Sequence, residues 1–377
     1  MQSVDINKKI WLSSPHMGDM EQVYVKEAFD TNWVAPIGPN ITAFEKAIAH
    51  SLEENVHVAA LSSGTAALHL GLQLLGVKRG DLVICQSFTF SASANPIMYL
   101  GATPVFVDSE KDTWNLSPDL LNSAIADSIK NGKKPKAIIA VHLYGMPYKI
   151  KEVRAIADKF GIPILEDSAE ALGSSYMEKR CGTFGDIGIL SFNGNKIITT
   201  SGGGALVSKN PDYINKAVFL ATQARDEAPH YQHSHVGYNY RMSNILAGIG
   251  RGQMLVLEDR VMARRRNYEI YRKELDDVTG IEFLSEPSGF YSNRWLSCVL
   301  TPSFTIREKI RLALLEENIE SRPLWKPLHL QPVFENFPKF INGTSEDLFS
   351  RGLCLPSGSN LTQYDLNCVI EKIKTMF

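Results

Sequence analysis

The sequence predicts an α/β protein in which a mainly parallel sheet lies between helices. Three observations support this class. Short apolar runs alternate with amphipathic segments between about residues 56 and 208. Most of these runs are apolar on both faces, as strands are when helices cover both sides of a sheet. One amphipathic segment joins two such runs directly, which makes a βαβ unit.

Seven apolar runs are predicted to be strands. They cover residues 56–63, 81–88, 103–110, 136–145, 162–170, 186–192 and 204–208. The crossover helix is predicted over residues 148–161. Apolar residues recur there at helical spacing from Ile150 to Phe160, and Gly161 then offers a C-cap.

A smaller domain is predicted to follow the large one. A long helical stretch begins near Met242, and beyond about residue 258 the charged residues become denser and the predicted strands shorter. We therefore expect a large α/β domain over residues 1–257 and a small α+β domain over residues 258–377.

Composition and charge exclude several classes of protein. The 377 residues are 44% hydrophobic and 21% charged, which is typical of a globular chain. A formal net charge of -2 gives no general attraction to nucleic acid or to an anionic membrane. No apolar run approaches the roughly 18 residues of a spanning helix, and the N-terminus lacks the apolar core of a signal peptide. The five cysteines form no CxxC pair, so we expect no disulfide framework, no metal and a reducing, cytoplasmic compartment.

Residues that could bind a ligand or take part in a reaction follow several of the predicted strands. Ligands of open α/β sheets bind beyond the carboxyl ends of strands, so these side chains are expected at one edge. After the first strand, "SSGTAAL" places small hydroxyl residues and Gly64 at a helix N-terminus. This suits an anion, although a simple N-cap explains it equally well. After the second strand, Phe88 fits either as the cover of a flat ring or as a core aromatic.

Two further strand ends carry ionisable groups. Glu166 and Asp167 close an apolar strand, which is costly unless a metal or a protonated heteroaromatic nitrogen compensates the charge. For Glu166 we expect an ordinary carboxylate at the surface edge. Lys196 follows Ser191 and the strand 186–192, among small uncharged residues. Such a lysine suits Schiff-base chemistry, whereas most lysines are simply solvated. Together the four strand ends have the parts that pyridoxal phosphate requires.

Several long motifs resemble the DegT/DnrJ/EryC1 family of sugar aminotransferases, which have fold type I and use pyridoxal 5′-phosphate. They are "SSGTAAL", "QSFTFSASANP", "EDSAEALG", "SFNGNKIITTSGGGALVS", "GYNYRMSNILAGIG" and "SRPLWKPLH". The resemblance implies that Lys196 forms the Schiff base and that Asp167 pairs with the pyridine nitrogen. The other cofactor contacts that it implies are Ser63, Gly64, Thr65, Ala66, Phe88, Glu170 and Ser191, with Asn239 reaching the cofactor of a neighbouring subunit. Glu170 and the "NGN" before Lys196 depart from the family pattern.

The resemblance also extends to a subgroup with a defined substrate. "PHMGDMEQVYVKEAFDTNWVAPIGPN", "SNRWL" and "SRPLWKPLH" resemble bacterial enzymes that act on UDP-linked 4-keto-6-deoxy-N-acetylhexosamines. This implies a homodimer with shared active sites, L-glutamate as amino donor and a product used in glycan synthesis. The candidate substrate contacts are Asn32, Trp33, Asn293, Arg294, Arg322, Trp325, Lys326 and His329, and surface charge or core packing is an equal alternative for several of them.

Other interpretations stay open. The stretch "HYQHSH" (230–235) holds three histidines, but no nearby carboxylate or cysteine completes a familiar metal site. "SGGGA" lacks the full GxGxxG of a nicotinamide-dependent enzyme. Within the family, a dTDP- or GDP-linked keto-sugar aminated at C3 or C4, or a non-catalytic regulator that binds the cofactor, remains an alternative.

Overall fold

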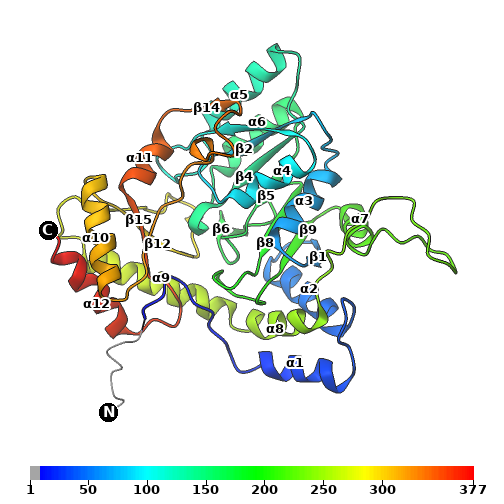
Figure 1. Ribbon diagram of the computed structural model, residues 1–377, viewed down its shortest axis with the longest axis horizontal. Coiled ribbons are helices and arrows are strands. Elements are labelled where there is room, and N and C mark those ends of the chain that lie inside the picture. The colour runs from blue at the N-terminus through cyan, green and yellow to red at the C-terminus, as the bar shows by residue number, and fades with distance from the viewer. Residues whose placement is uncertain (1–8) are drawn as a thin grey trace.

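The computed structural model describes residues 9–377 and confirms the α/β class (Figure 1). Its central sheet has eight strands in the order β1-β9-β8-β5-β4-β2-β3-β14. Their bounds are β1 (His57–Leu61), β2 (Leu82–Gln86), β3 (Thr103–Val107), β4 (Ala137–Val141), β5 (Ile164–Asp167), β8 (Ile187–Ser191), β9 (Gly204–Ser208) and β14 (Lys339–Phe340). Each of the seven predicted runs contains one strand of this sheet, in chain order β1, β2, β3, β4, β5, β8 and β9. Pairing is parallel except where β9 runs antiparallel to β1 and β8.

Helices cover both faces of this sheet, which explains why its strands are apolar on both sides. Along β4, Ile139 packs into the cluster formed with α3 and α7, while Ile138 packs into the cluster formed with α5 and α6. The predicted crossover helix is α6, and its C-cap Gly161 is left-handed, with φ 57°. The helices of this part are α1 (Glu21–Asp30), α2 (Pro39–Ser51), α3 (Gly64–Leu74), η1 (Ser91–Ser93), α4 (Asn95–Tyr99), α5 (Pro118–Lys130), η2 (Leu143–Gly145), α6 (Ile150–Phe160), α7 (Pro211–Ala221) and α8 (Asn244–Met254).

The C-terminal part forms a second, four-stranded sheet in the order β10-β12-β15-β13, to one side of the large sheet (Figure 1). A three-stranded sheet, β11-β6-β7, is separate from both. The remaining elements are β6 (Ser175–Tyr176), β7 (Lys179–Arg180), α9 (Leu257–Glu274), β10 (Glu282–Phe283), β11 (Phe290–Tyr291), β12 (Ser297–Leu300), α10 (Phe304–Glu316), β13 (Arg322–Pro323), η3 (Leu328–Leu330), α11 (Thr344–Arg351), β15 (Gly352–Leu355) and α12 (Gln363–Lys374).

We propose that the boundary between two domains lies near residue 257, where α9 begins. Two segments cross this boundary. Ile10 forms a β-bridge with Ile319 of the C-terminal part, and β14 pairs with β3 of the large sheet. Residues 1–8 of the proposed large domain lie outside the described residues. Within residues 9–377, none of the helices combines the length and the apolar character that crossing a bilayer requires.

A buried carboxylate ties the two parts together. Asp108 directly follows β3, and its two oxygens accept hydrogen bonds from the backbone N–H groups of Ser109, Asn342, Gly343 and Ser345 at 2.8–3.1 Å. The last three lie at the start of α11, where free N–H groups and the helix dipole favour a negative charge. A residue of the large sheet therefore caps a helix of the C-terminal part.

Replacing Asp108 by Ala should lower the free energy of unfolding by about 3 kcal/mol, because four N–H groups lose their acceptor, two of them in buried hydrogen bonds and two in partly buried ones. Urea unfolding followed by circular dichroism measures this change. The exposed Asp277→Ala is the control and should unfold like the parent chain. Equal stability of the two variants would contradict a locking role for Asp108.

Candidate active site

A cavity of about 260 Å³ lies at the carboxyl edge of the central sheet. Loops that follow β1, β2, β5 and β8 line it, as expected for an open α/β sheet. The structure brings most of the predicted cofactor residues together here, namely Ser63, Gly64, Thr65, Asp167, Glu170, Ser191 and Lys196. Their individual roles stay predictions.

The start of α3 forms one wall of this cavity. Ser63 is the N-cap, and its Oγ accepts a hydrogen bond from the Ala66 N–H at 3.0 Å. The N–H of Ala66, a residue that the resemblance implies to contact the cofactor, is thus already bonded, and Ala66 is not among the lining residues. A side chain on Gly204 would lie 2.4 Å from the backbone nitrogen of Gly64, so only glycine lets β9 pass this close. That approach places Ser191 beside the helix start, where small hydroxyl groups and a helix dipole suit an anion.

Lys196 lies in the loop after β8, and its amine contacts two groups of the wall. Nζ is 3.6 Å from Oε1 of Glu170 and 4.3 Å from the centroid of the Trp295 ring. The other Glu170 oxygen accepts a hydrogen bond from the Tyr144 N–H at 2.7 Å. Burial raises the pKa of Glu170, and the charge of Lys196 acts in the opposite direction. The amine is therefore held at the wall by an ion pair and a cation–π contact.

Asp167 ends β5 and lines the cavity. Its oxygens accept hydrogen bonds from Ser93 Oγ at 2.7 Å and from the Ala169 N–H at 3.1 Å. Burial nevertheless raises the pKa of the Asp167 carboxyl above its usual value. A cation placed against this carboxylate would restore the charge that burial disfavours, and a protonated ring nitrogen is such a cation.

Glu166 does not lie at the surface edge as we expected from the sequence. Successive residues of a strand point to opposite faces, so Glu166 points away from the cavity and is 0% exposed. It accepts hydrogen bonds from His142 Nε2 at 2.7 Å and from the backbone N–H groups of Gly182, Phe184 and Gly185 at 2.5–2.7 Å. Burial alone would raise the pKa of Glu166, but the hydrogen bonds from His142 and the backbone outweigh it and lower the pKa.

Among the described residues, His142, Glu166 and Cys181 are close enough to hold a metal ion. The ligand atoms of the first two are engaged with each other, and His142 Nδ1 also accepts a hydrogen bond from the Tyr148 N–H. We therefore assign this group a structural role. In the part of the chain that the structure describes, the histidines of residues 230–235 form no such group.

Phe88 is not the residue that lines the cavity. It is fully buried in a cluster with Tyr144 and Trp295, so its alternative role as a core aromatic is correct. Phe90 lines the cavity instead, and 51% of it is exposed. Phe88 and Phe90 both follow the end of β2 at Gln86 and are two residues apart, so strand alternation does not decide which of them faces the cavity.

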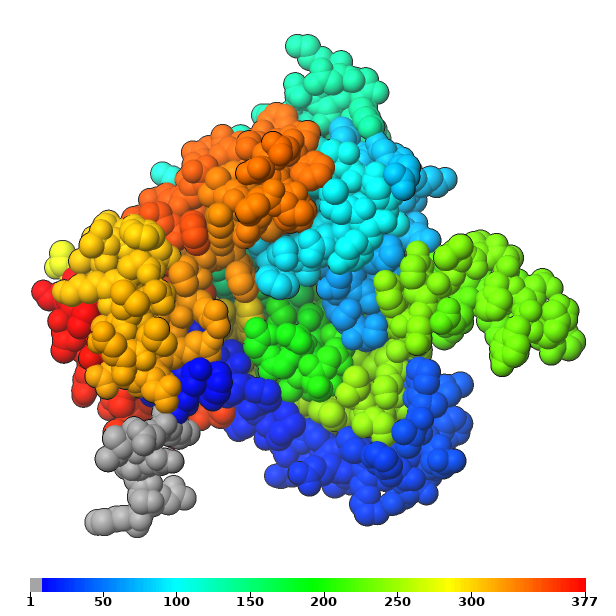
Figure 2. Space-filling view, in the orientation of Figure 1, coloured from blue at the N-terminus to red at the C-terminus, as the bar shows by residue number. Residues whose placement is uncertain are grey.

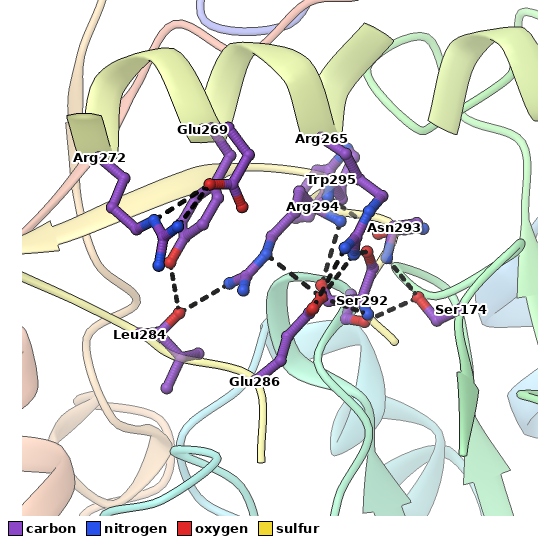
Figure 3. Close-up of polar contacts among 12 residues, drawn as sticks. Ser174, Arg265, Glu269, Arg272, Leu284, Glu286, Ser292, Asn293, Arg294 and Trp295 are labelled. Atoms are coloured by element: carbon purple, nitrogen blue, oxygen red, sulfur yellow. Dashed lines mark hydrogen bonds and ion pairs between the residues drawn. The ribbon is translucent and has the colours of Figure 1, made fainter. Parts of the chain in front are cut away.

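Three of the predicted substrate contacts face protein rather than a cavity. The Asn293 amide donates hydrogen bonds to the carbonyls of Glu170 and Leu172. The Arg294 guanidinium lies 3.7 Å from the centroid of the Tyr268 ring, donates to the Leu284 carbonyl and faces Glu286 (Figure 3).

His329 is the third, and it is buried between the Ser87 hydroxyl and Glu346. Asn293, Arg294 and His329 thus line neither cavity, and neighbouring protein groups contact their polar atoms; their direct contact with substrate stays a prediction.

A second cavity of about 520 Å³ adjoins the first and shares Asn195, Trp295 and Trp325 with it. The predicted contacts Arg322, Trp325 and Lys326 line this second cavity. The Tyr144 ring stacks with Trp295 and Trp325 at centroid distances of 6.3 and 6.2 Å. Sequence reasoning missed Tyr144 and Trp295, although the quoted "SNRWL" contains Trp295.

The last three predicted contacts lie outside both cavities. Asn32 and Trp33 are exposed between α1 and α2, and Asn239 is exposed near the start of α8. The segment between α7 and α8 leaves the body of the molecule as an arm, coloured yellow-green in Figure 2. A single chain therefore does not bring these residues to the site.

Replacing Glu166 by Gln should cost about 3 kcal/mol at neutral pH, because an amide oxygen cannot accept all the buried donors. The pKa of Glu166 is lower in the folded chain than its ordinary value of 4.5, which applies to the unfolded chain. The ionised carboxyl therefore stabilises the fold at pH values above 4.5, and this stabilisation is lost as the pH falls through the folded pKa. The difference in unfolding free energy between the parent chain and Glu166→Gln should thus become smaller below about pH 4.5. Thermal unfolding between pH 7 and 3 measures it, with the exposed Glu335→Gln as control. A gap that does not change with pH would contradict the assignment.

Comparisons with known proteins agree with this site. The model of the DegT/DnrJ/EryC1/StrS aminotransferase family matches residues 15–374. The chain is 51% identical over 376 residues to EpsN of Bacillus subtilis (strain 168), which is named a pyridoxal phosphate-dependent aminotransferase; the match covers 99% of this chain and 97% of EpsN. It is 36% identical to the GDP-perosamine synthase of Escherichia coli O157:H7 over 98% of this chain and 99% of the relative.

Among solved structures, the PLP form of Spr1654 from Streptococcus pneumoniae, named a sugar aminotransferase, superposes with a TM-score of 0.91. It is 26% identical, and the match covers 98% of each chain. The chain therefore belongs to the DegT/DnrJ/EryC1/StrS aminotransferase family, and its cofactor is pyridoxal phosphate.

Proposed function

We propose that this enzyme moves an amino group from L-glutamate to the C4 keto group of a UDP-linked 4-keto-6-deoxy-N-acetylhexosamine. The product would be UDP-4-amino-4,6-dideoxy-N-acetylglucosamine, a precursor for glycan synthesis. One observation carries the aminotransferase chemistry: the Lys196 amine, the Asp167 carboxylate and the start of α3 line one cavity. Pyridoxal phosphate bound there would supply an electron sink for the carbon that gains or loses the amino group.

The residues of the first cavity fit this cofactor. The start of α3, with Ser63, Thr65 and Ser191, suits the phosphate, and Asp167 suits the protonated ring nitrogen. A side chain on Gly202 would meet nothing within 4 Å, so this glycine leaves open space at the cavity wall. The amine of Lys196 is the nucleophile that would hold the cofactor aldehyde.

We assign proton transfer to the same lysine. Its Nζ is the basic nitrogen that lines the cavity beside Glu170, and the long contact of 3.6 Å leaves it free to leave that carboxylate. Trp295 covers it on another side. The lysine can thus hold a proton at Nζ and return it to the reacting carbon without bulk water.

The second cavity supports a nucleotide diphosphate as the other part of the substrate. Arg322 and Lys326 line it and offer positive charge beside the aromatic rings. The Arg322 guanidinium pairs with the Glu320 carboxylate at 2.9 Å. Because the Arg322 side chain is exposed, water screens this ion pair and a diphosphate could displace it. A GDP-linked 4-keto sugar is a second candidate, because relatives named GDP-perosamine synthase match 96–98% of the chain.

We also propose a homodimer with shared sites. Asn32, Trp33 and Asn239 would then enter the site of the second subunit. The arm between α7 and α8 carries large apolar residues with little cover: Tyr231 is 79% exposed and Val236 is 81% exposed. Exposed apolar groups gathered on one projecting segment favour a surface that another chain covers.

Lys196→Ala should abolish the visible absorbance of the lysine-bound cofactor and lower glutamate-dependent turnover by at least a factor of about 1,000, since nucleophile and proton carrier are lost together. Absorbance spectra and a coupled assay for 2-oxoglutarate measure the two effects. Lys209→Ala, on an exposed lysine paired with Glu54, is the matched control. A purified parent chain that never takes up pyridoxal phosphate would contradict the proposal.

A panel of UDP-, dTDP- and GDP-linked keto-sugars tests the substrate. We expect the UDP-linked 4-keto sugar to have a kcat/KM at least about tenfold above the others, as one well-placed hydrogen bond to the base can provide. Preference for a GDP-linked 4-keto sugar would favour the second candidate. Amination of a 3-keto sugar alone would reject both.

A further inference from the structure

Arg264 of α9 is a buried cation that has no anionic partner among residues 9–377, the part of the chain that the structure describes. It is 1% exposed, and burial lowers the pKa of its guanidinium to about 9, so it stays charged at neutral pH. Its hydrogen-bond acceptors are neutral oxygens: the Trp295 carbonyl at 2.5 Å, the Ser13 hydroxyl at 2.9 Å and the Lys196 carbonyl at 3.4 Å. A buried charge with no carboxylate beside it is costly, so stability alone does not explain its presence.

The acceptors of Arg264 belong to one closed network around the base of Lys196. The Asn195 carbonyl accepts hydrogen bonds from Trp295 Nε1 and from the Ser13 hydroxyl, both at 2.7 Å. Ser13 and Trp295 both accept from Arg264, which closes the ring. The turn before the lysine thus takes part in this network through the main chain, because it presents the Asn195 carbonyl to two donors.

The segment that carries Trp295 is held from two sides. Arg265, the next residue of α9, donates to the Ser292 carbonyl and pairs with Glu286, as Figure 3 shows. From the other side, Asn293 donates to the carbonyl of Glu170. Helix α9 therefore fixes the Trp295 ring and the base of Lys196 as one unit, next to the carboxylate of Glu170.

We propose that Arg264 is a positioning residue for Lys196, which holds the main chain of the lysine and the Trp295 ring in the arrangement that lets the amine capture the cofactor. This inference rests on the function proposed above. A guanidinium can do this because its donors form a rigid fork that reaches separate acceptors, whereas a lysine ammonium is a single point. Arg264 acts through Lys196 and does not itself line either cavity.

The test measures how fast the full chain, stripped of cofactor, captures added pyridoxal phosphate, from the growth of its visible absorbance. Arg264→Met should capture it roughly tenfold to a hundredfold more slowly, because a small misplacement of a reacting group has effects of this size. Its thermal unfolding should stay near that of the parent chain, because removal of a desolvated charge offsets the lost hydrogen bonds. Arg264→Lys, which keeps the charge, should recover part of the rate.

A second readout needs no cofactor. Labelling by a small amine-reactive acylating agent, followed by mass spectrometry, should modify Lys196 several-fold faster in Arg264→Met, because its loop is released. The rate at other lysines, such as the half-buried Lys149, should not change. Arg272→Met is the matched control, since Arg272 is an exposed arginine of the same helix, paired with Glu269 (Figure 3). It should behave as the parent chain in both measurements.

Capture at the parent rate by a folded Arg264→Met overturns the proposal. If that variant unfolds, Arg264→Lys decides: slowed capture by the folded protein supports the proposal, and an unchanged rate overturns it. Neither measurement uses an amino donor or a sugar. A chain with normal cofactor capture and no turnover of any nucleotide sugar would therefore count against the proposed function, whereas slowed capture in Arg264→Met would still support the positioning role.

Discussion

The site depends on how β5 ends in two adjacent carboxylates that point to opposite faces. Glu166 faces the protein and receives backbone N–H groups from residues 182, 184 and 185 together with His142, so its charge is fully matched. Asp167 faces the cavity with fewer donors, and burial leaves its pKa raised. One carboxylate thus fixes the turn that leads into β8, and the other stays available for a cationic ligand. Exchanging the two roles would require only a shift of the strand by one residue.

Asp108 and Arg264 are two buried charged groups away from the cavity, and their hydrogen-bond partners among the described residues are neutral groups rather than opposite charges. Asp108 is surrounded by N–H groups, and two of the acceptors of Arg264 are carbonyls. Such neutral partners do not titrate. At the cavity the arrangement differs, because Lys196 faces the titratable Glu170 at 3.6 Å. A rigid frame around a loosely paired amine is what a lysine needs if it is both to bind a cofactor and to carry protons.

The sequence predicted the sheet and most of the cofactor cavity, because both follow from local patterns: apolar runs, a helix start after a strand, and polar residues at strand ends. It failed where partners are distant in the chain. The donors to Glu166 lie up to 24 residues away, so its burial left no local signal. Strand alternation could not distinguish Phe88 from Phe90, because β2 ends at Gln86 and residues two apart would share a face in any case. Arg294 was chosen over Trp295 for its charge, yet the ring meets the lysine while the guanidinium stacks on Tyr268. The short strand β14 has no apolar run of its own.

The two cavities separate chemistry from recognition in space. Lys196, Asp167 and the start of α3 line only the first cavity, whereas Arg322 and Lys326 line only the second. Tyr144, Trp295 and Trp325 form a stack of rings at their junction. Under the proposed function, the keto carbon would lie on the first side and the nucleotide diphosphate on the second. Substitutions in the second cavity could then change the nucleotide that is accepted without moving the cofactor residues. Under the same proposal, the residues that decide between UDP and GDP are to be sought around Arg322 rather than around Lys196.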